Sequence, residues 1–320
     1  MAKSKITLEQ YIGFRKKNAT GEKKNIPIGK IIAFIFLLLF CAVWILPFFI
    51  MFFGSLRGHV DALNGSPKDL FFPQHGYTLE NYKMLLLGEY PDLGQYVSPP
   101  EVGWRIGRWF INSCISAIGG TLLYLFVASI AAYAFTFIDF KYRNLIFSIL
   151  VGSLVIPGVA TTVGNHNLVY SMGLDKSLLA LIIPGLGGVY GMYLIKTFFE
   201  SIPKDLIESA RMDGYSNFKI FVKIVLPLGK TVLFVQGLFG FMGGWNDLIW
   251  PQMLYSADIS QDLWTLQVGM AAIINNSKSG EGLIGLALAG GVICLVPVLI
   301  MYIIAQDKII EGMASSGIKR

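Results

Sequence analysis

Long apolar stretches alternate with shorter polar segments along most of this 320-residue chain. Six windows of roughly 20 residues hold almost no charged side chain, and a helix of about 20 apolar residues crosses the ~30 Å hydrocarbon core of a bilayer. No long alternating pattern predicts the strands of a barrel, so the sequence predicts an all-α membrane protein with six transmembrane helices. The predicted spans are Ile31–Phe53, Phe110–Phe137, Leu145–Val163, Leu178–Ile195, Thr231–Trp250 and Leu283–Ala305.

The composition agrees with a membrane location. Hydrophobic residues make up 54% of the chain and charged residues only 14%, with a mean hydropathy of +0.60. Soluble domains carry about 25% charged residues. The first apolar stretch runs on without a small-residue cleavage site, which favours a retained helix over a signal peptide. The three cysteines fall inside apolar spans and form no metal or disulfide pattern, so we expect them to pack as small apolar residues.

The lysines and arginines predict the orientation of the spans. With the N-terminus inside, the segments on the inner side hold 19 of the 26 basic residues, including eight in residues 1–30. Basic residues gather on the cytoplasmic side of inner-membrane proteins, so both termini are expected in the cytoplasm. The net charge of +6 follows from this topology and gives no reason to expect a nucleic acid.

The predicted topology divides the chain simply. A cytoplasmic segment, residues 1–30, precedes one six-helix domain, residues 31–320. The domain carries an outer loop at 54–109, an inner loop at 196–230 and a cytoplasmic tail at 306–320.

The inner loop contains the signals of two short helices. Pro203 suits the first turn of a helix, and Gly214 suits a left-handed residue that ends it. Ser216 or Asn217 can cap a second helix, which Pro227 ends or kinks before the next span. A rigid helix–turn–helix is therefore expected at the inner face of the membrane.

Residues of this loop carry a resemblance to a known family. Glu208, Ser209 and Ala210 are followed after three residues by Gly214, and after nine more by I-V-L-P at 224–227. This resembles the EAA loop of the inner-membrane subunits of ABC importers, with Ser209 as the one departure. W-N-D at 245–247 and the tail at 305–320 resemble the MalG-like permease of maltose-type carbohydrate importers.

The resemblance implies a fold and partners. The fold is that of a type I ABC importer permease with a cytoplasmic EAA coupling helix. The partners are a second, MalF-like permease subunit, two ATPase subunits, an extracytoplasmic sugar-binding protein and a sugar, in the bacterial cytoplasmic membrane. The chain has no phosphate-loop motif, so ATP and Mg²⁺ are expected on the ATPase and no cofactor on this chain.

The resemblance also implies contacts with the ATPase. The coupling helix would sit in a cleft of that subunit, with Glu208 facing a basic group and with Leu206 and Ala210 packed into the cleft. The alternative is a helix pair that lies on the inner leaflet. The residues expected at this contact are Leu206, Glu208, Ser209, Ala210, Asp213 and Gly214, with Gly312, Ser316 and Gly317 as second contacts from the tail.

Polar residues in the fifth span are candidates for a substrate path. Gln236, Trp245, Asn246 and Asp247 supply amides, a carboxylate and an aromatic face, which are the groups that bind sugars. Polar groups within a bilayer usually face protein or water. Packing is the alternative role for Asp247, and the sequence leaves both open.

The expected function is import of a sugar, an oligosaccharide in particular, by ATP-driven alternating access. Polyol phosphates such as glycerol 3-phosphate and acidic oligosaccharides are alternatives, although the spans hold almost no basic residue to bind an anion. An ion-driven secondary transporter would show buried ionisable relays and repeated broken helices, neither of which the sequence predicts beyond Asp247. No nucleophile, histidine and acid set predicts a catalytic site, so the chain is not expected to be an enzyme.

Overall fold

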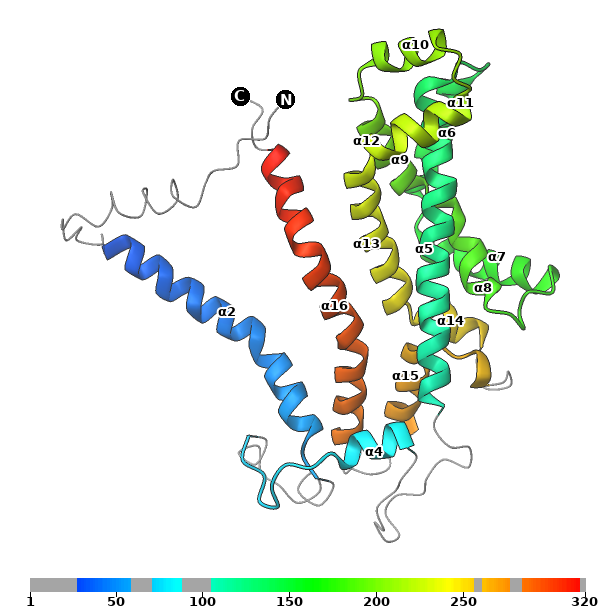
Figure 1. Ribbon diagram of the computed structural model, residues 1–320. Helices are drawn as coiled ribbons and strands as arrows, with labels where there is room; N and C mark the ends of the chain where they lie inside the picture. Colours follow the sequence, from blue (N-terminus) through cyan, green and yellow to red (C-terminus); the bar gives the residue numbers. More distant parts are fainter. Residues whose placement is uncertain (1–27, 59–70, 88–104, 256–260, 277–283, 317–320) are drawn as a thin grey trace. The chain divides into compact units, whose positions relative to one another are not determined.

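The computed structural model describes residues 28–58, 71–87, 105–255, 261–276 and 284–316, and these residues form helices and connecting turns (Figure 1). Two compact units divide the chain, Met1–Ile50 and Met51–Arg320. The first unit contains most of α2, Ile28–Ser55, in which every residue as far as Ile50 is exposed. A helix that is apolar on all sides and exposed on all sides fits surroundings of lipid.

Within the described residues, three helices are long and apolar enough to cross a membrane: α2, α5 (Ile106–Phe137) and the part of α16 (Ile284–Ser316) that ends at Gln306. Two bent pairs of helices would bring the number to five if each pair forms one span. The helix α13, Lys230–Asn246, has 17 residues and ends before Trp250, where the predicted span ended. The all-helical membrane fold is confirmed, and the count of six spans stays a prediction.

The predicted span Leu145–Val163 is not one helix, which corrects the sequence prediction. The helix α6, Arg143–Gly152, continues into the 3₁₀ turn Ser153–Val155 and meets α7, Gly158–Ser171, at a bend of 104°. Ile156 is extended at the break because a proline disfavours the helical conformation in the residue before it.

The predicted span Leu178–Ile195 is broken as well. It consists of α8 (Leu179–Ile182), the 3₁₀ turn Ile183–Gly187 and α9 (Val189–Phe199), with a bend of 49°. A β-carbon on Gly188, at the break, would lie 2.4 Å from Cε2 of Tyr124 on α5. Only a glycine lets the break approach α5 this closely.

The helix α5 is the axis of the second unit and packs most extensively against α13 (Figure 1). Small residues make the approach close. A β-carbon on Gly244 would lie 3.2 Å from Cα of Ala117, and one on Gly240 would lie 3.1 Å from Cγ2 of Thr121. Helices in membranes associate through such close contacts, since lipid is as apolar as the side chains.

Short helices gather at the two ends of α5 (Figure 1). Near its first residues lie α4 (Glu80–Leu87), the 3₁₀ turn η6 (Gln261–Leu263) and α15 (Leu266–Asn276), with α14 (Ile249–Leu254) following α13. Near its last residues lie α10 (Lys204–Met212), α11 (Asn217–Ile220), the π-helical turn η5 (Phe221–Val225) and α12 (Leu226–Leu228).

Pro227 does not end the second helix of the inner loop, which corrects that part of the prediction. The backbone widens into the π-helical turn η5 before the proline, and the chain continues through α12. A π turn relieves the clash between a proline ring and the preceding turn of an α-helix.

Candidate functional site

The helix α10 is anchored to the body of the protein through one face. Ile207 and Ala210 have exposed fractions of 2% and 6% and lie in a hydrophobic cluster that includes Phe137, Phe199 and Ile220. Ala210 therefore packs inside its own chain, which corrects the expectation that it packs into an ATPase cleft beside Leu206. The motif places a small residue here because the helix lies close to the cluster.

The turn after α10 has the geometry that the sequence predicts. Gly214 has a φ of +78°, its N–H donates to the carbonyl of Arg211 at 3.0 Å, and the N–H of Tyr215 donates to the carbonyl of Ala210 at 3.0 Å. This pair of bonds is a Schellman motif, which ends a helix on a left-handed glycine. The motif fixes the direction in which the chain leaves α10.

A side chain that sequence reasoning missed ties α10 to α5. Nη2 of Arg211 donates to the carbonyl oxygen of Phe137, the last residue of α5, at 2.6 Å. The last carbonyls of a helix lack partners within the helix and carry partial negative charge, so a guanidinium is a suitable donor. The signal in the sequence is a basic residue inside the motif, but its partner lies 74 residues away.

The second helix of the loop, α11, has a side-chain cap at its start and is also attached to the body of the protein. Oγ of Ser216 accepts the N–H of Lys219 at 3.3 Å, which confirms the predicted cap. Phe221 and Val225 are buried, and the ring of Phe221 lies 5.3 Å from that of Tyr133 on α5. The helix pair is thus part of the folded body, and its other face is free to contact a partner.

The outward face of the loop mixes apolar and polar groups. Leu206 is 48% exposed and Met212 is 88% exposed. Glu208, Ser209 and Asp213 are exposed as well. Their contact with an ATPase remains a prediction. Of the tail residues, Gly312 and Ser316 lie in the last turns of α16, whereas Gly317 lies outside the described residues.

The candidate path residues of α13 do not form one surface. Gln236 is buried, and its Oε1 accepts a hydrogen bond from the hydroxyl of Tyr124 at 3.2 Å. A β-carbon on Gly191 of α9 would lie 2.9 Å from the same Oε1. Gln236 therefore occupies the contact between α5, α9 and α13.

Trp245 packs in the core. Its exposed fraction is 1%, its Nε1 donates to the carbonyl of Cys294 on α16 at 3.0 Å, and its ring contacts those of Phe110 and Phe241. This burial corrects the expectation that it offers a sugar an aromatic face. Asn246 is exposed and donates to the carbonyl of Met242 of its own helix at 2.9 Å.

Asp247 lines a cavity of about 290 Å³. One of its carboxylate oxygens accepts the N–H of Trp250 at 3.3 Å. Ser116, Thr121 and Tyr124 of α5 line the same cavity, and sequence reasoning missed all three. Among the described residues that line it, Asp247 alone is a carboxylate, and basic side chains are absent.

Thr121 is the unusual member of this cavity. Its Oγ1 is buried and has no hydrogen-bond partner within the described part of the chain. A buried hydroxyl without a partner destabilises a protein by about 1–3 kcal/mol, which makes Thr121 a residue to test.

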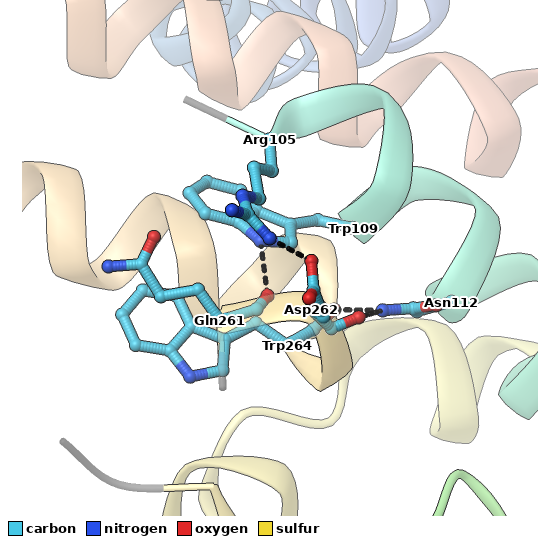
Figure 2. Close-up of polar contacts among 6 residues, drawn as sticks. All are labelled: Arg105, Trp109, Asn112, Gln261, Asp262 and Trp264. Atoms are coloured by element: carbon cyan, nitrogen blue, oxygen red, sulfur yellow. Dashed lines mark hydrogen bonds and ion pairs between the residues drawn. The ribbon is translucent and has the colours of Figure 1, made fainter. Parts of the chain in front are cut away.

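The first turns of α5 are held by polar contacts (Figure 2). Arg105 forms an ion pair with Asp262, and Nε1 of Trp109 donates to the carbonyl of Gln261 at 2.9 Å. Nδ2 of Asn112 donates to the carbonyls of Asp262 and Trp264 at 2.7 and 2.9 Å. These bonds hold η6 against the start of α5. In the described residues, no group of three or more His, Cys, Asp or Glu side chains could hold a metal ion.

Comparisons with known proteins identify the kind of protein. Residues 124–309 match the family described as "Binding-protein-dependent transport system inner membrane component". The chain is 25% identical over 285 residues to the arabinooligosaccharides transport system permease protein AraQ of Bacillus subtilis, covering 89% of this chain and 94% of that protein. It is 29% identical over 215 residues to the diacetylchitobiose uptake system permease protein NgcG of Streptomyces coelicolor, covering 67% and 70%.

A solved structure has the same fold. The fold matches a chain in the crystal structure of a bacterial ABC transporter involved in the import of the acidic polysaccharide alginate, with a TM-score of 0.72. The match covers 90% of this chain and 99% of that chain at 20% identity. The family match covers more than half of the sequence, and the chain therefore belongs to the inner membrane components of binding-protein-dependent ABC importers.

Proposed function

We propose that this chain is the MalG-like subunit of an importer that moves an oligosaccharide into a bacterial cell by alternating access. It would work with a MalF-like second permease subunit, two ATPase subunits that bind ATP and Mg²⁺, and an extracytoplasmic sugar-binding protein. Relatives named for arabinooligosaccharides and diacetylchitobiose support the substrate class. Both termini would lie in the cytoplasm, with α13 as one of six spans.

The observation that carries the coupling role is the attachment of α10 to α5. A helix that is bonded through Arg211 and packed through Ile207 moves as one body with the end of α5. The helix α5 also lines the cavity that contains Asp247. Closure of the ATPases against the exposed Leu206 and Glu208 would thus be transmitted along α5 to the substrate path.

The cavity favours a neutral sugar over an anionic substrate. It offers the hydroxyls of Ser116 and Thr121, the phenol of Tyr124 and the carboxylate of Asp247. These groups suit sugar hydroxyls, which both donate and accept hydrogen bonds. A carboxylate repels the phosphate of a polyol phosphate and the acid groups of an acidic oligosaccharide. The two broken helices do not favour an ion-driven secondary transporter, because the family to which the chain belongs works with a partner ATPase.

The test is purification of the complex on an N-terminal tag, with mass spectrometry of the co-purified chains. The wild type should bring the second permease and the ATPase, and Gly214→Pro should lose the ATPase alone because proline cannot adopt a positive φ or donate the bond to Arg211. Gly173→Pro is the matched control, since Gly173 also has a positive φ and a bonded N–H on a different turn. Retention of the ATPase by Gly214→Pro, or its equal loss from both variants, would refute the coupling role.

ATP-dependent uptake of labelled arabinan and chitin oligosaccharides by the reconstituted complex tests the substrate. Uptake of a neutral oligosaccharide, without competition by glycerol 3-phosphate or an acidic oligosaccharide, is the expected result. Uptake of only the anionic compounds would contradict the argument from the cavity.

A further inference from the structure

Another cavity, of about 520 Å³, lies beside the start of the coupling helix α10. The last turn of α5, the first turns of α6 and the last turn of α9 form its walls, together with Lys204 at the start of α10. Three cationic side chains, Arg143, Lys196 and Lys204, line it, and Glu200 is the one anion among the described lining residues. None of these residues takes part in the functions proposed above.

The charges in this cavity are not balanced. Nζ of Lys196 lies 2.5 Å from Oε1 of Glu200, so this pair is neutral. Arg143 pairs at 2.8 Å with Asp139, whose side chain is 97% exposed and which does not line the cavity. Exposed pairs of this kind contribute little. Lys204 forms none of the ion pairs found in the described part of the chain, so the cavity has an excess of positive charge suited to an anion.

The walls between these charges mix apolar side chains with the polar Thr136, Asn144 and Ser148. Phe135, Phe147 and Ile202 line the cavity, and Nζ of Lys196 lies 4.5 Å from the centre of the Phe147 ring. The neighbouring helix α6, which is described throughout, has no buried residue, and its Leu145 and Ile149 are 57% and 64% exposed. A ligand here meets cationic side chains, and the exposed Leu145 and Ile149 belong to the helix that forms one wall. An anionic phospholipid suits both features, whereas a free phosphate ion would leave the exposed apolar side chains of α6 uncovered.

We propose that this cavity binds the phosphate group of an anionic phospholipid of the inner leaflet, with its acyl chains against the exposed side of α6. Lys204 provides the unpaired charge, and Arg143 and Lys196, which pair with Asp139 and Glu200, provide further donors. The choice of leaflet rests on the orientation proposed above. Basic pockets between helices on the cytoplasmic side of membrane proteins suit such headgroups. Since Lys204 begins α10, the bound lipid would join the coupling helix to α5, α6 and α9.

The experiment uses the whole detergent-purified complex, titrated with dioleoyl phosphatidylglycerol or dioleoyl phosphatidylcholine and followed by native mass spectrometry. The wild type should bind phosphatidylglycerol in preference. Lys204→Gln should weaken that binding about fivefold, since each basic group near an anionic lipid contributes about that factor. Phosphatidylcholine binding should not change. Lys141→Gln, which removes an exposed charge outside the cavity, should behave as the wild type.

The same titration contains the results that would overturn the proposal. Equal binding of the two lipids by the wild type, or equal effects of the Lys204 and Lys141 variants, would do so. Release of the lipid by millimolar inorganic phosphate would assign the cavity to the free ion. Loss of the ATPase from Lys204→Gln with unchanged lipid binding would assign it to protein contact. Lys204→Arg should keep the preference and serves as the folded control.

Lipid binding is measured without transport or ATP, so it is separable from the coupling role. A failed Gly214→Pro prediction with intact lipid preference would refute the coupling proposal and leave the lipid site standing. Loss of the ATPase from Gly214→Pro, together with no preference for phosphatidylglycerol in the wild type, would refute the lipid site alone.

Discussion

Arg211 of α10 donates a 2.6 Å hydrogen bond to the carbonyl oxygen of Phe137, at the end of α5. The bond joins a helix expected at an ATPase surface to the helix that lines the Asp247 cavity. If motion passes through this contact, its removal should loosen the relation between ATP hydrolysis and uptake rather than abolish assembly.

Arg211→Ala should therefore lower sugar uptake per ATP hydrolysed, with the ATPase still bound. The lost bond to a charged donor is worth about 1 kcal/mol at this partly exposed position, which corresponds to roughly a fivefold effect. Uptake and ATP hydrolysis measured in the same proteoliposomes check this. Lys223→Ala is the control, because Lys223 is an exposed cation of the same loop. An unchanged ratio in Arg211→Ala would show that the bond does not transmit motion.

Thr121→Val tests whether the buried hydroxyl binds substrate. Valine has nearly the same shape and removes a polar atom without a partner, so the melting temperature should stay the same or rise slightly. Uptake at low sugar concentration should fall about tenfold if the sugar pairs with Oγ1, which corresponds to ~1.4 kcal/mol. Unchanged uptake in a stable variant would remove Thr121 from the path.

Trp245→Phe separates packing from substrate contact. The variant keeps an aromatic ring but loses the donor to the Cys294 carbonyl, so it should be less stable by about 1–3 kcal/mol. The sugar concentration for half-maximal uptake should not change. A large change in that concentration, with normal thermal stability, would restore the aromatic-face prediction.

Gly191→Ala should destabilise the contact of α5 with α9. A β-carbon at this position would lie 1.3 Å from the hydroxyl oxygen of Tyr124, and overpacking of this kind costs about 1–3 kcal/mol. Gly187→Ala is the control in the same bent span, because nothing lies within 4 Å of its added carbon. The melting temperature in detergent measures both effects. Adding Gly191→Ala to a Tyr124→Ala protein should lower that temperature less than adding it to the wild type.

Asn112→Ala should release η6 from the start of α5. Two carbonyls, of Asp262 and Trp264, lose their donor, with an expected loss of about 2 kcal/mol. Asn246→Ala removes an amide that bonds only within its own helix and should have a smaller effect. Hydrogen exchange of residues 261–266 would locate the change, and equal protection in the two variants would contradict it.

The sequence alone predicted the features that involve only neighbouring residues, such as helix caps and turns. The left-handed Gly214 and the Ser216 cap follow from the φ and hydrogen-bonding needs of the residues themselves. The apolar windows likewise predicted an all-helical membrane protein, since burial in lipid requires only composition and length, but not the breaks within two of the windows. The EAA-like spacing, read with these helices, was sufficient to predict the family.

Only the tertiary structure decided what each polar or aromatic side chain meets. Pro157 was visible in the sequence, but the 104° bend depends on how α6 and α7 pack. Trp245 became a core residue and Ala210 an anchor because their helices face α16 and α5 on those sides. Arg211 and Phe137, or Thr121 and Asp247, lie far apart along the chain. Helix packing brings the first pair into contact and places the second pair around one cavity, and no single residue pattern records that outcome.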